Sequence, residues 1–133
     1  MVQITASLLA LLAAVSLTHA VPSTLVARKP DCSSGTRTNP GDAARCIREL
    51  AALGSVCTTD YGGRILRICG TAMIWSHSRG PKGASTPCKN VAASAGLIMD
   101  ACTYNTGPSA GIQVAGAAYV QGNGDFWIRI EHS

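Results

Sequence analysis

Apolar and polar positions along the chain alternate in two distinct rhythms, one helical and one extended. The first helical stretch covers residues 43–53, where apolar side chains recur every three or four positions and charged ones fall mostly on the opposite side. Asn39-Pro40 or Asp42 can begin this helix, and Gly54 can end it. We therefore predict an amphipathic helix with one buried face.

The second helical stretch, Cys88–Cys102, is the clearer of the two. Thr86 before it predicts an N-cap, with Pro87 at the first helical position, where a missing N–H costs nothing. Its apolar stripe recurs at spacings of three, four and seven and consists of Cys88, Val91, Ala92, Ala95, Met99 and Cys102. This pattern predicts a second amphipathic helix.

Between the helices the pattern is that of extended structure. Residues 55–59 predict a short strand, and residues 60–63 a turn. The isoleucine-rich residues 64–78 predict further extended structure, which Cys69-Gly70 bends or bulges. Residues 79–85 form a Gly/Pro/Lys loop, the most basic exposed stretch.

Alternation over residues 112–120 and 126–131 predicts a C-terminal hairpin. A two-residue turn at Asn123-Gly124 would mix the faces, and a one-residue slip would put Arg129 on the core face. We therefore predict a three-residue loop at residues 122–124, whose last glycine suits a left-handed conformation. The pairs in this register are Val120 with Phe126 and Ala118 with Ile128.

That register makes Tyr119 and Trp127 cross-strand neighbours on the outer face of the hairpin, where Ala115, Ala117 and Arg129 accompany them. The face is apolar for a solvated surface. Either another part of the chain covers it, or it is a contact patch for a ligand or for a second copy in a homodimer.

The first twenty residues have the pattern of a secretory signal peptide. Residues 8–17 are almost unbrokenly apolar yet too short for a membrane span, which takes roughly 20 residues. Thr18-His19-Ala20 then supplies small residues for cleavage, although no Lys or Arg precedes the apolar run. Residues 21–30 predict either a removed propeptide or a disordered tail, and residues 31–133 a single domain. No later segment is long enough to span a membrane, and we expect a secreted, extracellular protein.

Six cysteines behind a secretory leader predict three disulfides and leave their pairing open. No pair has the short spacing typical of zinc sites, so no metal is expected. The six are Cys32, Cys46, Cys57, Cys69, Cys88 and Cys102.

A formal net charge of +4 makes the chain mildly basic. Such a charge permits attraction to anionic surfaces without requiring it. No run of Lys or Arg exceeds two, and no aromatic-plus-basic stripe is recognisable, so we expect no nucleic-acid partner. The candidates for a basic loop are Arg79, Lys82 and Lys89.

Catalytic residue sets are not evident in the sequence. A ribonuclease would need His77 and His132 to act with Glu131 and a basic residue such as Arg129 or Arg79, and nothing in the spacing selects this. The chain has no phosphate-cradling glycine loop. We expect no enzyme and no cofactor.

From Asp31-Cys32 through the hairpin, the chain resembles the small cysteine-rich secreted effectors or elicitors of plant-associated filamentous fungi. Its element order is also similar to that of the smut-fungus killer toxins, which are α/β sandwiches. The matching features are the cysteine-bearing helix over residues 43–53, the strand with Cys69-Gly70, and the helix Cys88–Cys102 that runs into the hairpin. The order of elements predicts an α+β fold, an antiparallel sheet with two amphipathic helices packed on one face.

The resemblance implies a secreted, non-enzymatic effector or elicitor that acts at, or is perceived by, a host plant cell through a surface receptor. One alternative is a killer-toxin-like or antimicrobial protein that acts on competing microbes. Another is a cell-wall carbohydrate-binding protein that uses Tyr119 and Trp127.

Overall fold

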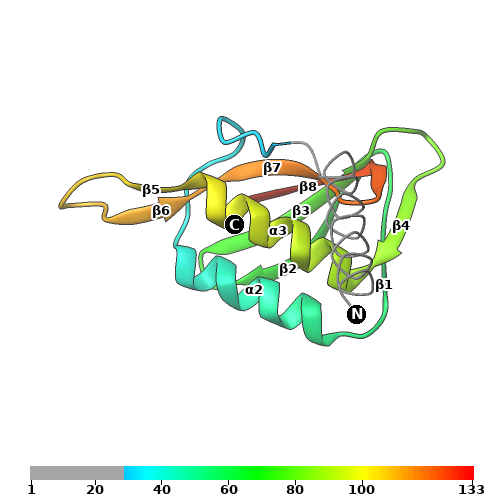
Figure 1. The fold of residues 1–133 in the computed structure, drawn as a ribbon, viewed down its shortest axis with the longest axis horizontal. Coiled ribbons are helices and arrows are strands. Elements are labelled where there is room, and N and C mark those ends of the chain that lie inside the picture. The colour runs from blue at the N-terminus through cyan, green and yellow to red at the C-terminus, as the bar shows by residue number, and fades with distance from the viewer. Residues whose placement is uncertain (1–28) are drawn as a thin grey trace, which may run out of the picture.

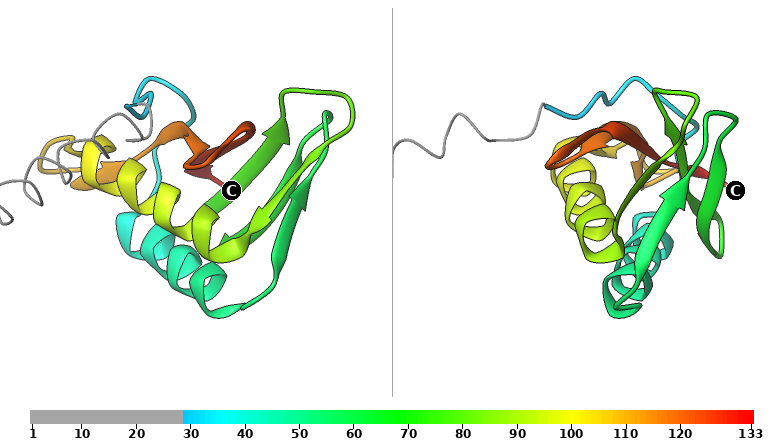
Figure 2. Two further views of the ribbon diagram at one scale, coloured as in Figure 1. Left: turned by 45° about the vertical axis from the view of Figure 1, so that its right-hand side comes forward. Right: turned by 90° about the vertical axis from the view of Figure 1, so that its right-hand side faces the viewer.

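The computed structural model describes residues 29–133, so the predicted signal peptide and residues 21–28 lie outside the described residues. Two helices pack on one face of an antiparallel sheet, as the sequence predicts (Figures 1 and 2). In chain order the elements are α2 Pro40–Ala52, β1 Val56–Thr59, β2 Arg64–Cys69, β3 Ala72–Ser78, β4 Ala84–Pro87, α3 Cys88–Cys102, β5 Thr103–Asn105, β6 Ile112–Val114, β7 Gly116–Val120 and β8 Asn123–His132.

Helix α2 begins where its sequence signals predict. The Asn39 side chain accepts a hydrogen bond from the backbone N–H of Asp42 at 3.0 Å, which satisfies one of the unpaired donors of the first turn. Pro40 follows as the first helical residue. The helix buries Ala43, Cys46 and Leu50 on one face, which confirms most of the predicted stripe, whereas Leu53 at its C-terminal end is exposed.

Helix α3 has the predicted bounds but not the predicted cap. Pro87 is the N-cap residue and makes no side-chain capping bond. Thr86 instead belongs to β4, where it pairs with Cys57 of β1. The strand therefore continues up to the helix, and Thr86 is held in the ladder instead of capping α3. The buried residues of α3 are Cys88, Val91, Ala92, Ser94, Ala95, Ile98 and Cys102.

The main sheet has the order β2-β3-β8-β7, with every pairing antiparallel. Residues 64–78 were predicted as one bent or bulged stretch, but they form two strands that reverse at Gly70-Thr71. Gly70 has a φ of 59°, which favours glycine at this turn. The bulge lies elsewhere, between Ile65 and Arg67.

The C-terminal hairpin keeps the predicted register in its body and departs from it at the turn. Ala118 pairs with Ile128, as predicted, but a bulge pairs Val120 with Asn123 instead of Phe126. The left-handed glycine is Gly122, with a φ of 84°, and not Gly124.

The predicted strand over residues 112–120 is also divided. Residues 112–114 form β6, which pairs with β5 in a separate arm that projects from the body (Figure 1). The strand resumes as β7 at Gly116, where a Cβ would lie 2.7 Å from Sγ of Cys102. The glycine therefore allows β7 to pass close against α3.

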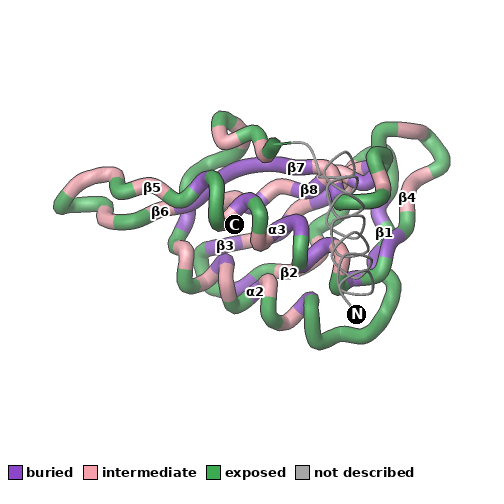
Figure 3. The backbone as a smooth tube through the Cα atoms, viewed as in Figure 1, coloured by how far each residue is buried: buried purple, intermediate pink, exposed green. Residues whose placement is uncertain are grey.

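Three disulfides join segments far apart in sequence, as predicted from the cysteine count. Cys32–Cys102 ties the N-terminal segment to the end of α3, Cys46–Cys69 ties α2 to β2, and Cys57–Cys88 ties β1 to the start of α3. The core that they surround lies between the helices and the sheet (Figure 3).

Asp42 links the start of α2 to the β2–β3 turn. The backbone N–H and the hydroxyl of Thr71 each donate to its Oδ2 at 2.9 Å, and these two bonds, with a smaller contribution from Arg45, lower the pKa of Asp42. Because the folded pKa lies below the unfolded value of about 3.9, this carboxylate stabilises the fold above that pH, and the contribution is lost as pH falls through the folded pKa.

We therefore expect Asp42→Asn to flatten the loss of stability on acidification below about pH 4, because the amide still accepts from Thr71 but does not titrate. Urea unfolding at neutral and acidic pH measures the difference. If variant and parent lose the same stability on acidification, Asp42 does not contribute to the acid sensitivity.

Candidate binding face

The face of the main sheet that points away from the helices, here called the outer face, carries large aromatic and charged side chains. Strand β3 alternates throughout between buried and half-buried residues, and β8 does so over residues 126–131. Ile74 and Ile128 point into the core, so Trp75, His77 and Trp127 lie on the outer face.

Three rings from three neighbouring strands form a line across this face. His77 of β3 pairs with Trp127 of β8, which pairs with Tyr119 of β7. The ring centroids of His77 and Trp127 are 4.6 Å apart. We call His77, Trp127 and Tyr119 the aromatic row, in which the predicted pairing of Tyr119 with Trp127 is confirmed.

Arg129 and Trp75 support the row from the next ladder position, where they pair with each other. The Arg129 guanidinium lies 4.8 Å from the ring centroid of Trp75 and 5.5 Å from that of Trp127. Its Nη2 also donates to Oε1 of Glu131 at 3.2 Å. A cation held over two rings gains roughly 0.5–2 kcal/mol per contact, so Arg129 is fixed in place and its charge is balanced by Glu131.

Trp75 has a second support, the glycine turn that precedes β2. A Cβ at Gly63 would collide with the Trp75 indole, and Gly63 has a φ of 94°. The indoles of Trp75 and Trp127 meet edge to face, with centroids 5.9 Å apart. The site is therefore built on regular strands, and its rings pack against one another without a ligand.

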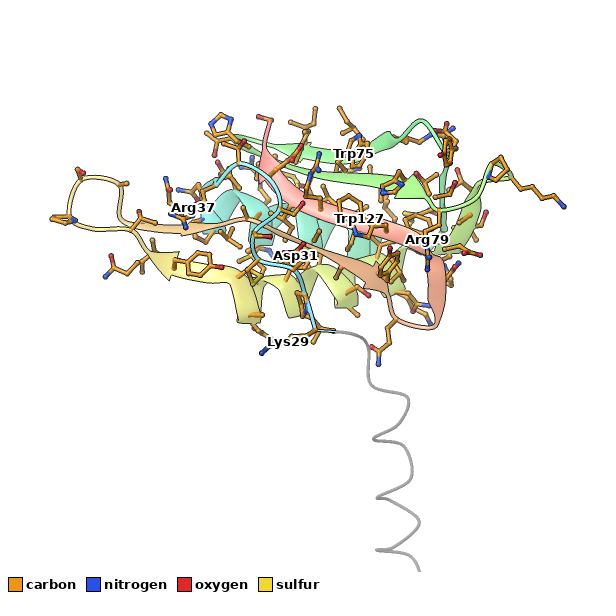
Figure 4. The ribbon with its side chains drawn as sticks, turned by 90° about the horizontal axis from the view of Figure 1, so that it is seen from above. Lys29, Asp31, Arg37, Trp75, Arg79 and Trp127 are labelled. Carbon is orange, nitrogen blue, oxygen red and sulfur yellow. A yellow bond between two sulfur atoms is a disulfide. The ribbon has the colours of Figure 1, made fainter. Side chains whose placement is uncertain are left out.

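Arg79 lies at the Tyr119 end of the row. It directly follows β3, and its guanidinium stands 5.4 Å from the ring centroid of Tyr119. Within residues 29–133, no carboxylate lies within 4.0 Å of it. Arg79 is thus an unbalanced cation beside the rings, and Figure 4 shows it grouped with Trp75 and Trp127.

Residues 29–38, the N-terminal segment, cover another part of the outer face. Asp31 pairs with Ala117 on the free edge of β7, with N···O distances of 2.8 and 2.9 Å. Gly35 lies against Arg129, since its Cβ position would be 3.1 Å from Cδ of that arginine. Ala117 and Ala115 are only 1% and 2% exposed, so they do not belong to an accessible patch as the sequence predicted.

The predicted basic loop does not form one cluster. Arg79 stacks on the aromatic row, whereas Lys82 is exposed in the loop before β4. Lys89 belongs to the first turn of α3 and lines a separate cavity of about 400 Å³ with Ala51, Gly54, Ser55, Val56 and Pro87. The three cations thus lie in three different settings.

The two histidines considered for nuclease chemistry are not brought together. His132 is aligned with Ala72, five residues before His77 on the same strand. At about 3.3 Å per residue, this places them roughly 16 Å apart along the sheet. Over residues 29–133, no group of three His, Cys, Asp or Glu side chains is arranged to hold a metal, and no helix has the length and apolar character needed to cross a membrane.

Sequence reasoning placed Tyr119, Trp127 and Arg129 on this face but did not place Trp75 and His77 there. The alternation of buried and half-buried residues from Ala72 to Ser78 indicates that Trp75 and His77 share a face. It can be recognised once Gly70-Thr71 is identified as a hairpin turn. The turn aligns Trp75 and His77 with the strand that carries Trp127.

These features define a small cysteine-rich α+β domain with three disulfides and an aromatic outer face. The chain belongs to the family described as "Domain of unknown function (DUF8794)", whose model matches residues 27–132. Neither a curated protein nor a solved structure matches the chain.

Proposed function

We propose that this chain is a secreted, non-enzymatic effector or elicitor that acts at, or is perceived by, a host plant cell. The observation that carries the proposal is the aromatic row with Arg79, which places three rings and a cation side by side on the outer face. Tyr, Trp and Arg are the residue types that dominate binding energy at interfaces.

The rigidity of the row supports binding as its role. Trp127 is fixed by ring contacts to Trp75 and His77, and Arg129 by two rings and Glu131. Side chains that are ordered before binding lose little further entropy when a partner arrives. A pre-formed surface of this kind suits a protein that must recognise a partner at low concentration.

An extracellular place of action is supported by the disulfides and by the resemblance of the chain to secreted fungal effectors. Disulfides persist in oxidising surroundings and are rare in the cytosol. Three of them, closing sequence separations of 23, 31 and 70 residues, protect a small core outside the cell.

Infiltration of the purified, oxidised protein into leaves tests the proposal. We expect a defence or cell-death response that Trp127→Ala weakens, because Trp127 is the central ring of the row. Ile112→Ala is the matched control, since Ile112 is 59% exposed on the projecting arm. Absence of any response to the parent protein rejects the proposal, and an equal loss with both variants rejects the row as its recognition surface.

The second candidate is a killer-toxin-like or antimicrobial protein that acts on competing microbes. The observation that favours it is the pair of cations at Arg79 and Lys82, neither of which has an ion-pair partner within the described part of the chain. Growth assays on fungi and bacteria decide, with Arg79 and Lys82 neutralised for comparison. Unchanged growth at micromolar dose excludes this activity.

A further inference from the structure

The aromatic row offers more than apolar area, because each of its rings has both a flat face and a polar edge. An imidazole, an indole and a phenol follow one another on β3, β8 and β7 at His77, Trp127 and Tyr119. With strands about 4.8 Å apart, the row extends about 10 Å across the sheet. Such a strip suits an extended chain whose units have apolar C–H faces and polar rims, as sugar rings do.

The charges on the outer face indicate which kind of sugar chain fits best. Arg129 is balanced by Glu131 and remains a fixed donor of hydrogen bonds, whereas Arg79 has no carboxylate within 4.0 Å among residues 29–133. A guanidinium pairs best with a planar carboxylate, through two parallel hydrogen bonds. The chain as a whole is also positive, at +4.

From the rings and the unbalanced arginine together, we infer that the aromatic row binds an acidic polysaccharide, a chain of sugar rings that carry carboxylates. The rings stack on His77, Trp127 and Tyr119, and one carboxylate pairs with Arg79. The assignment rests on the proposed function, because a protein that acts outside the cell is the kind that meets extracellular polysaccharides. It names the ligand of the face on which that function depends.

A single-stranded nucleic acid also combines rings with negative charge, but it fits this face less well. Proteins that bind such strands use a positively charged groove that tracks the phosphate backbone. Here one unbalanced cation, Arg79, lies beside the row, and Lys82 lies in the loop that follows. The nucleic acid therefore becomes a comparison ligand in the test.

Both tryptophans of the chain, Trp75 and Trp127, lie on the outer face, so intrinsic fluorescence reports directly on this site. The probe is polygalacturonate, titrated into the oxidised protein. Its fully methyl-esterified form is the matched control, because it keeps the sugar rings and removes the charge. We expect the acid form to change tryptophan emission and to bind at least tenfold more tightly than the ester, since a hydrogen bond between two charged groups is stronger than one to a neutral ester.

Variants separate the roles of ring and charge. Arg79→Gln is expected to weaken binding of the acid form about tenfold and to leave binding of the ester unchanged, whereas Lys82→Gln changes neither by more than about twofold. Trp127→Ala is expected to weaken binding of both forms, and Trp127→Phe, which keeps a ring, to restore most of it. Calorimetry supplies the affinities of the Trp127 variants, and circular dichroism verifies their folding.

Each contrary result has a definite meaning. Equal affinity for acid and ester, or equal losses with Arg79→Gln and Lys82→Gln, overturns the acidic class of ligand. Tighter binding of a single-stranded oligothymidylate, or no binding of either polysaccharide, overturns the assignment. A protein that binds polygalacturonate but provokes no leaf response rejects the proposed function and keeps the ligand.

Discussion

Replacing Cys32 and Cys102 together by alanine is expected to lower the free energy of unfolding by about 4 kcal/mol. This disulfide closes a sequence separation of 70 residues, the longest of the three. By constraining the unfolded chain, a cross-link over a longer loop removes more of its entropy. Cys102 is fully buried, so the substitution also leaves space in the core.

The matched comparison is the double replacement of Cys46 and Cys69 by alanine. The disulfide between these two residues closes a sequence separation of 23 residues. Loop length alone gives about 3 kcal/mol for this pair. Urea unfolding of both variants, with the remaining disulfides oxidised, shows which replacement lowers the free energy of unfolding more. A larger loss for the shorter loop would show that local packing around α2 and β2 outweighs the loop effect.

The Cys32–Cys102 bond has a further consequence for the outer face. It anchors the N-terminal segment, which pairs with β7 at Asp31 and lies against Arg129 at Gly35. Without the bond, the segment is held chiefly by its backbone hydrogen bonds with β7, β6 and His132. The disulfide thus fixes how much of the outer face remains uncovered.

Much of the fold was predictable because local rules and tertiary packing agree in the helices. The apolar stripe of α2 and the cap at Asn39 point to the same element, and the structure contains it. The stripe of α3 was equally legible, yet its cap was not, because the pairing of Thr86 with Cys57 is a contact between distant residues. Helix bodies follow from periodicity, whereas helix ends depend on what the neighbouring backbone does.

The strands were harder for a related reason. Periodicity shows which residues share a face, but it does not show where a chain reverses, as it does at Gly70-Thr71. The hydrogen bonds from Thr71 to Asp42 that support this reversal join residues 29 positions apart. Only half of the outer face was therefore predictable: Tyr119 and Trp127 follow from the hairpin, while Trp75 and His77 need the β2–β3 turn.

The sequence left open whether another part of the chain covers the outer face or leaves it as a contact patch, and in the structure each applies to a part of the face. Ala115 and Ala117 are buried, the latter beside Asp31, while Tyr119 and Trp127 remain half-exposed. Alternation places all four on one face but contains no information about a segment that returns from far along the chain. The pairing of residue 31 with residue 117 is a tertiary event, and it decides which part of the face is left for a ligand.

Phe126→Ala is expected to destabilise the fold by about 3–5 kcal/mol, the range for removing a buried phenylalanine. Phe126 is the only phenylalanine of the chain, is 0% exposed, and is the largest of the fully buried side chains. Ile112→Ala removes a side chain that is 59% exposed, and a change within about 0.5 kcal/mol is expected. Urea unfolding compares the two with the disulfides intact.

The position of Phe126 makes this variant informative about the binding face as well. It lies on β8 directly before Trp127 and faces the core, while Trp127 faces outward. A cavity beneath this part of β8 loosens the strand that holds the centre of the aromatic row. We therefore expect weaker binding of polygalacturonate by Phe126→Ala than by the parent, although the row itself is intact. If Phe126→Ala lowers the free energy of unfolding by less than about 1 kcal/mol, the disulfides contribute more to the stability of the domain than the packing around Phe126 does.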